Sequence, residues 1–262
     1  MPSLEPILPH LVPFVLVAFR LGGMFLLAPM LTSAMIPPRF KVLMVIAMAG
    51  SLYPTLPHVA APDLDLFSLL PMVVCELAIG FVMGLIAAVP LAAMEMAGVV
   101  AGQQVGFGLA RVYNPEMEAD TDILGQLLFY LAIGAFVALN GVETLFVSLA
   151  DTFHRVPPGG MLAITPPLDM LLGVIMSGFE LAMRVAAPVT GITLLLVVAL
   201  GVVGKTMPQL NIMAVGFTLK IVGAISILAA ATHVISAVAG DEVRDVLSRI
   251  TQWAPSVAPA IR

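Results

Sequence analysis

Six ionisable side chains lie inside long apolar stretches of the sequence, where a charge is costly. They are Arg20, Glu76, Glu95, Glu180, Arg184 and Lys220. Charged residues in such surroundings are usually paired, or they face protein or a water-filled cavity that can carry ions or protons. We therefore expect buried polar positions that line a water-filled path or a seam between subunits, or that pair for structural reasons. Glu180 and Arg184 are four residues apart and can pair on one helix face.

Nothing else in the sequence resembles a catalytic or metal-binding constellation. The four histidines, His10, His58, His154 and His233, are far apart, and Cys75 is the single cysteine. A serine nucleophile elbow and a His-Glu-x-x-His pair are both missing from the sequence. Gly106-Phe-Gly108 follows a predicted helix and lacks the third glycine of a dinucleotide-binding loop. The sequence thus predicts neither an enzyme nor a bound metal or cofactor.

Small residues recur every four positions in the centre of the chain. Gly98, Gly102 and Gly106 follow one another at this spacing, and Gly80 and Gly84 precede them. Glycines spaced in this way lie on one face of a helix and let another backbone approach closely. The pattern predicts a packing seam, either between subunits or within the chain.

The most polar internal segment runs from Gly106 to Asp122. Its side chains include Phe107, Arg111, Tyr113, Asn114, Pro115, Glu116, Met117, Glu118 and Asp120. A proline disfavours the helical conformation in the residue before it, so we expect a loop. Because the loop would lie between two strongly apolar helices, it could change conformation at low cost.

Composition indicates which elements must position these residues. The chain has 262 residues, of which 60% are hydrophobic and 10% charged, with a mean hydropathy of +1.09. Soluble proteins carry about 25% charged residues. Several apolar runs of about 20 residues match the thickness of a bilayer, and they do not alternate as barrel strands would. We predict an all-α, polytopic membrane-type protein with long kinked helices and helical hairpins.

Prolines, glycines and charges set the expected boundaries of these helices. Pro37-Pro38 should form a turn, and Asn140-Gly141 should break a helix. The 66–109 segment should be one kinked helix or two helices broken near Pro90. We expect helices over 11–31, 39–53, 66–109, 123–152, 169–200 and 209–238, followed by a charged terminal helix over 241–250. Asp169 should be the N-cap of the 169–200 helix. A net charge of −5 without a basic stripe argues against nucleic acid as a partner.

Six motifs follow one another along most of the chain: Arg20-Leu-Gly-Gly23, Glu76-Leu-Ala-Ile-Gly80, the glycine-rich 98–106 segment, Phe153-His-Arg-Val-Pro157, Pro208-Gln-Leu-Asn211 and Gly216-Phe-Thr-Leu-Lys220. In their order and spacing they resemble the FliR family of the flagellar type III export gate. Two departures occur: the family usually has Asp-Pro where this chain has Asn114-Pro115, and Pro where it has Thr218. The first lowers the negative charge of the central loop.

The resemblance implies a role and a division of the chain. FliR-like proteins assemble with FliP-like and FliQ-like subunits, and with a FlhB-like subunit, at the flagellar basal body in the cell inner membrane. The assembly is the entry pore for unfolded flagellar proteins, and a loop of the FliR-like subunit, here 106–122, helps to plug it. Residues 1–165 would then be FliP-like, 166–240 a FliQ-like hairpin and 241–262 a charged tail.

Two alternatives remain open. The first is the equivalent export-gate subunit of a virulence injectisome, for which the central glycine-rich block is less typical. The second is a secondary transporter or ion channel that uses Glu76, Glu95, Glu180 and Arg184 as substrate or proton sites.

Overall fold

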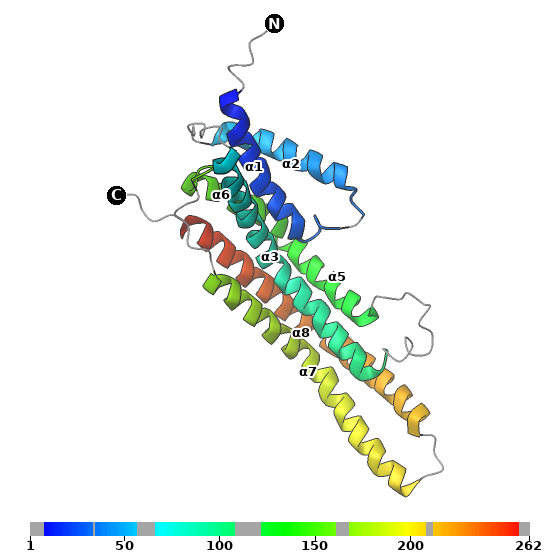
Figure 1. Ribbon diagram of the computed structural model, residues 1–262. Helices are drawn as coiled ribbons and strands as arrows, with labels where there is room; N and C mark the ends of the chain where they lie inside the picture. The colour runs from blue at the N-terminus through cyan, green and yellow to red at the C-terminus, as the bar shows by residue number, and fades with distance from the viewer. Residues whose placement is uncertain are drawn as a thin grey trace. The chain divides into compact units, whose positions relative to one another are not determined.

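The described part of the chain consists of helices joined by turns, which confirms the predicted all-α class (Figure 1). The computed structural model describes residues 8–33, 35–56, 66–107, 122–160, 168–207 and 212–256. In chain order the elements are α1 (Leu8–Leu27), α2 (Pro38–Leu52), the short 3₁₀ helix η1 (Tyr53–Thr55), α3 (Leu66–Val105), α5 (Ile123–Ala138), α6 (Gly141–Arg155), α7 (Leu168–Thr206) and α8 (Ile212–Ser256).

Two predicted boundaries are confirmed, and each has a local cause. Helix α2 begins at Pro38, the first helical position, where the missing N–H of proline costs nothing. Helices α5 and α6 are separated at Asn140, whose backbone is left-handed with φ 52° and ψ 39°. Asparagine tolerates this conformation better than most residues. The break therefore follows directly from the sequence.

Helix α3 is more continuous than its prolines suggest. It runs for 40 residues and continues through Pro90. Of the two predicted alternatives, two separate helices are wrong, because the helix does not end at this proline. A proline removes one backbone hydrogen bond, but long apolar helices tolerate that loss when their surroundings compensate for it.

The last two helices also extend past their predicted ends. Helix α7 begins at Leu168, so Asp169 lies in its first turn and is not its N-cap. It ends at Thr206, two residues before Pro208, and not at Leu200. Helix α8 continues through Gly240 to Ser256, so the charged terminal segment is its last part and not a separate helix. A single glycine costs only about 1 kcal/mol in a helix and does not end it alone.

The chain packs as two compact units, each built from segments distant in sequence. The first unit comprises Met1–Val89, Asn140–Ile175 and Arg244–Arg262, and the second comprises Pro90–Leu139 and Met176–Val243. Fully buried side chains in the first unit include Leu16, Met24, Met83, Leu145 and Phe153. Those in the second include Leu91, Met94, Leu128, Phe136 and Ala224.

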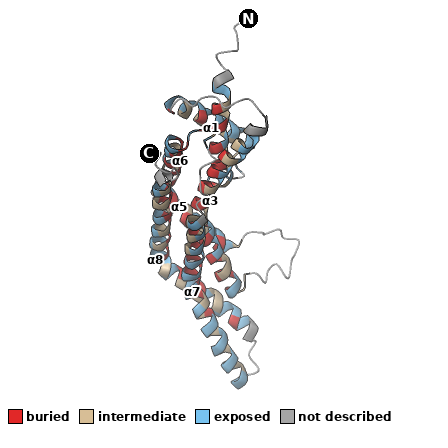
Figure 2. Cartoon of the chain, turned by 60° about the vertical axis from the view of Figure 1, so that its left-hand side comes forward, coloured by how far each residue is buried: buried red, intermediate tan, exposed pale blue. Residues whose placement is uncertain are grey.

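Helices α7 and α8 run side by side in the second unit (Figure 1), where a Cβ added at Gly216 or Gly223 of α8 would meet the side chain of Leu200 or Leu196 of α7. Figure 2 shows exposed residues along both helices. Only 22% of the apolar span in α7 and 17% of that in α8 is buried within the chain, compared with 44% in α1. Large apolar side chains on these helices therefore need a cover other than water.

Candidate functional site

Arg20 and Glu76 form an ion pair in the centre of the first unit. Arg20 lies on α1 and Glu76 on α3, and the Arg20 Nε donates to Glu76 Oε2 over 2.5 Å. Both side chains are completely buried. Arg20 and Glu76 were expected among the buried polar residues, but their pairing was not predicted, because the two positions are distant in sequence.

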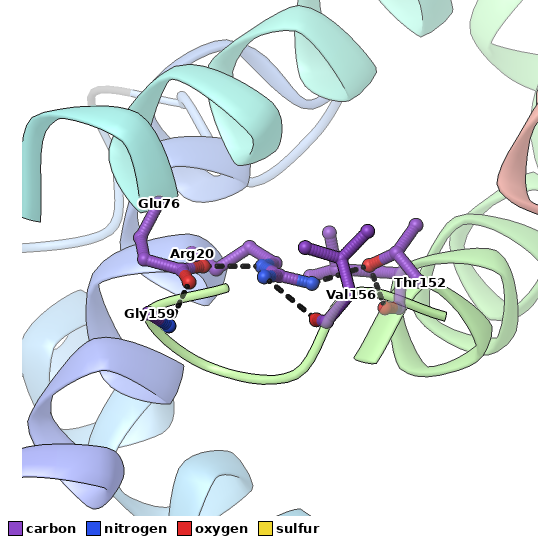
Figure 3. A network of polar contacts seen from close by, with 6 residues as sticks. Arg20, Glu76, Thr152, Val156 and Gly159 are labelled. Atoms are coloured by element: carbon purple, nitrogen blue, oxygen red, sulfur yellow. Dashed lines mark hydrogen bonds and ion pairs between the residues drawn. The ribbon is translucent and has the colours of Figure 1, made fainter. Parts of the chain in front are cut away.

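The rest of the Arg20 guanidinium is satisfied by the end of α6 and the residue after it (Figure 3). Nη1 donates to Thr152 Oγ1 over 3.0 Å, and Nη2 donates to the Val156 carbonyl over 3.1 Å. The guanidinium carbon also lies 4.0 Å from the centre of the Phe153 ring. This distance allows a cation–π contact, which is strongest where water is excluded.

The second carboxylate oxygen of Glu76 holds the turn that follows α6. Glu76 Oε1 accepts a hydrogen bond of 3.0 Å from the Gly159 backbone N–H. Gly159 has a positive φ of 84°, which favours glycine at this position. Arg20 and Glu76 thus connect α1 and α3 to both α6 and the 156–159 turn. We call Arg20, Glu76, Thr152, Val156 and Gly159 the buried polar network.

Close contact between α1 and α3 places the pair. A Cβ added at Gly23 of α1 would collide with the Leu77 carbonyl, and one at Gly80 of α3 would collide with the Arg20 carbonyl. Both obstacles are backbone atoms, which cannot move independently of their helices. The glycines therefore let the two backbones come close enough for the Arg20 and Glu76 side chains to meet.

Three sequence motifs that are far apart meet in this network. They are the Arg20-Leu-Gly-Gly23, Glu76-Leu-Ala-Ile-Gly80 and Phe153–Pro157 segments. Sequence reasoning missed the contributions of Thr152, Phe153 and Gly159. The available signal was an arginine and a glutamate, each alone in an apolar run, because two such charges stabilise each other best as a pair.

The network is suited to holding helices together and not to chemistry on a substrate. Its two charges are buried and paired with each other, and each guanidinium nitrogen donates a hydrogen bond within the network, so none of these groups is presented to a ligand at the surface. Replacing a buried ion pair with apolar groups is often close to neutral, whereas removing one partner leaves an uncompensated charge. The network therefore selects one arrangement of α1, α3 and α6.

The other four predicted buried polar residues are not buried within the chain. Glu95 is exposed, and Lys220 is half-buried. Glu180 and Arg184 do pair, at 2.5 Å, but their side chains are 69% and 61% exposed. A pair of this kind contributes about 0.3–0.5 kcal/mol. An apolar neighbourhood in sequence does not reveal which face of the helix a charged residue occupies, and burial of these four at a seam between subunits stays a prediction.

The predicted glycine seam packs within the chain in the described structure. A Cβ at Gly98 would collide with backbone atoms of Leu124 and Gly125, at the start of α5. A Cβ at Gly102 would collide with the carboxylate of Asp122. Gly106 has a φ of 105° and follows the last residue of α3. For Gly98 and Gly102, the structure therefore favours packing within the chain over a seam between subunits.

The predicted plug loop is described only at its ends. Gly106 and Phe107 follow α3, and Asp122 is the N-cap of α5. The remaining loop residues named in the prediction lie outside the described residues: Arg111, Tyr113, Asn114, Pro115, Glu116, Met117, Glu118 and Asp120. The loop assignment stays a prediction.

A hollow of about 290 Å³ lies in the second unit between α5 and α8. Leu124, Leu128, Leu131, Ile225 and Leu228 are among its lining residues. Its one hydroxyl, on Thr232, donates to the Leu228 carbonyl over 2.7 Å. The hollow is therefore apolar. Across the described ranges, histidine, cysteine and acidic side chains do not gather in a group of three that could hold a metal ion.

These features define a class of protein. Four described helices are long and apolar enough to cross a membrane, or five spans if α5 and α6 together count as one. The chain is a multi-pass, helical membrane-type protein that is held together internally by a buried ion pair and close glycine contacts. Residues 11–246 match the family described as bacterial export proteins, family 1, and the chain belongs to this family.

Individual relatives agree with this assignment. The flagellar biosynthetic protein FliR of Escherichia coli K12 is 30% identical over 210 residues, which cover 78% of this chain and 77% of the relative. FliR of Bacillus subtilis 168 is 26% identical over 211 residues, or 79% of this chain and 81% of the relative. The surface presentation of antigens protein SpaR of Salmonella typhimurium is 27% identical over 212 residues and covers 80% of both chains.

Proposed function

We propose that this chain is the FliR-like subunit of a flagellar type III protein export gate. The observation that carries the proposal is the extent of the family match. Residues 11–246 run from α1 into α8 and include the whole buried polar network. The flagellar assignment is supported by FliR relatives from distant bacteria, including Escherichia coli and Bacillus subtilis.

In this proposal the chain works as part of an assembly with FliP-like, FliQ-like and FlhB-like subunits. The exposed apolar side chains of α7 and α8 support it, because they need a cover of lipid or partner helices. The assembly lies at the flagellar basal body in the cell inner membrane and admits unfolded flagellar proteins. The role is one of transport, with no enzymatic step assigned to this chain.

The loop 106–122 is proposed to help plug the pore. Its polarity between two strongly apolar helices supports this role, as does its place between the ends of α3 and α5. Residues 1–165 would form the FliP-like part, 166–240 the FliQ-like hairpin and 241–262 the charged tail. The antiparallel neighbours α7 and α8 are consistent with a hairpin in the second of these parts.

Co-purification tests the proposal most directly. The chain would be isolated from native membranes in mild detergent, and the mass and composition of the complex determined. We expect a large, stable assembly that contains FliP-like and FliQ-like chains. A lone monomer or a homodimer would contradict the export-gate role and favour a transporter, for which flux into liposomes containing the isolated chain would be the next measurement.

An injectisome subunit is the second candidate, and its support is the similarity to SpaR. Deleting the chain distinguishes the two. Loss of flagellar filaments and motility, restored by the wild-type chain, would support the flagellar gate. Intact motility with loss of injectisome secretion would support the alternative.

A further inference from the structure

Asp122 contacts α3 as well as its own helix. As the N-cap of α5, its Oδ1 accepts hydrogen bonds from the Leu124 and Gly125 backbone N–H groups, over 3.1 and 3.4 Å. The same carboxylate lies against Gly102 of α3. A Cβ at Gly102 would lie 2.5 Å from Asp122 Oδ1 and 2.6 Å from Oδ2. A side chain at position 102 would therefore displace this carboxylate from the position it occupies.

Gly102 also takes part in ending α3. Its carbonyl accepts hydrogen bonds from the Gly106 and Phe107 backbone N–H groups, both over 3.1 Å. Gly106 has a φ of 105°, so this is the glycine-terminated helix end in which a carbonyl near the C-terminus binds the N–H five residues later. The Gly102 carbonyl therefore accepts the hydrogen bonds that end α3, and the absence of a side chain at Gly102 leaves space for the Asp122 carboxylate.

We propose that Gly102 and Asp122 form a latch that joins the end of α3 to the start of α5. Asp122 is then a positioning residue. It fixes the distance between the end of α3 and the start of α5, which residues 108–121 connect along the chain. This inference rests on the proposed function, in which that segment belongs to the plug. It also places Gly102 in a seam within the chain, which is one of the two predicted alternatives, and it makes Asp122 the anchor at the end of the loop.

A simple N-cap would have a different requirement. A cap needs only the α5 N–H groups, so losing a simple cap would weaken the start of α5 without changing how α3 and α5 are held together, and the ion leak would stay unchanged. The latch requires the carboxylate and the bare Cα together. Gly98, one turn earlier on α3, provides the matched control, because a Cβ there would meet the backbone of Leu124 and Gly125 and not the Asp122 side chain.

The test is a double-mutant cycle on the full-length chain, with Asp122→Ala, Gly102→Ala and both together. Thermal unfolding of the purified protein and ion leak through the assembled complex would be measured. Asp122→Ala should lower the unfolding midpoint by about 2–4 °C. It should raise the leak several-fold while leaving the yield of complex unchanged. Gly102→Ala should do the same, because the new methyl group displaces the carboxylate.

The leak decides between the latch and the simple cap, and the double variant tests whether positions 102 and 122 act through one contact. In a latch, Gly102→Ala adds no further loss once Asp122 is alanine, so the double variant should match Asp122→Ala. Gly98→Ala should instead add to Asp122→Ala. Asp122→Asn, which keeps an N-cap acceptor of the same size, should restore both midpoint and leak. Additive losses at positions 102 and 122, or a leak unchanged by Asp122→Ala, would overturn the proposal.

The latch and the gate can fail separately. If the wild-type chain does not assemble with FliP-like and FliQ-like partners, the proposed function fails. If the wild-type complex forms but the cycle is additive, only the latch fails.

Discussion

Arg20 Nε and Glu76 Oε2 lie 2.5 Å apart in the interior of the first unit, although 56 residues separate them along the chain. Each is the charged residue of an otherwise apolar stretch of its helix. The pair is surrounded by Thr152, Phe153 and the 156–159 turn, which bind or cover the remaining polar atoms. This relationship decides which helices meet in the first unit.

The ion pair predicts a rescue by double substitution. Arg20→Met or Glu76→Met alone should destabilise the chain, by about 3–5 kcal/mol where an unpaired charge is left buried. Arg20→Met combined with Glu76→Met should recover much of that loss, because both charges disappear together. Thermal unfolding in detergent and the amount of chain in membranes would be compared. A double variant as unstable as the sum of the singles would contradict the pairing.

Thr152 provides a narrower test of the same network. Thr152→Val keeps the shape of the side chain but removes the acceptor for Arg20 Nη1. We expect a loss of about 1–3 kcal/mol, because a buried donor is left unsatisfied. Thr144→Val on the same helix is the control, since that hydroxyl donates to the Asn140 carbonyl and is not in the network. Equal effects of the two substitutions in an unfolding experiment would argue against the assigned role.

Two adjacent glycines in α1 should respond in opposite ways to alanine. Gly23→Ala places a methyl group against the Leu77 carbonyl and should force α1 away from α3, with a clear loss of stability. Gly22→Ala meets no atom within 4 Å. It should leave the free energy of unfolding unchanged or raise it by about 0.5–1 kcal/mol, because alanine loses less conformational entropy in a helix than glycine does. Similar unfolding midpoints for the two variants would show that the α1–α3 contact is looser than described.

Deleting part of the central loop tests the proposed plug. Removal of Arg111–Asp120, with Gly102, Gly106 and Asp122 retained, should raise ion leak through the gate and leave the assembly intact. Both helix ends keep the contacts that define them in the structure. Membrane conductance and complex yield would be measured together. An unchanged leak with normal complex yield would exclude the loop as a seal.

Local sequence signals predicted the helix breaks that depend on a single residue. Pro37-Pro38 and Asn140-Gly141 act through their own backbone preferences. The break at Asn140 is confirmed, and the turn before α2 is confirmed as far as Pro37, since Pro38 is already the first helical residue. Signals that surroundings can override were less reliable. Pro90 and Gly240 both lie inside long helices, because one lost hydrogen bond or one flexible residue costs less than the packing gained along the helix.

The sequence by itself determined the class of the protein: an excess of apolar residues can be buried only by long helices that face lipid or other helices. It also singled out Arg20 and Glu76 as charges that need partners. The tertiary structure decided that these two residues pair with each other. It also placed Glu95, Glu180 and Arg184 on the chain's surface and turned Gly98 and Gly102 toward α5. The reason is physical: periodicity and composition define the helices, but contacts between distant segments depend on how the helices pack, which no local pattern encodes.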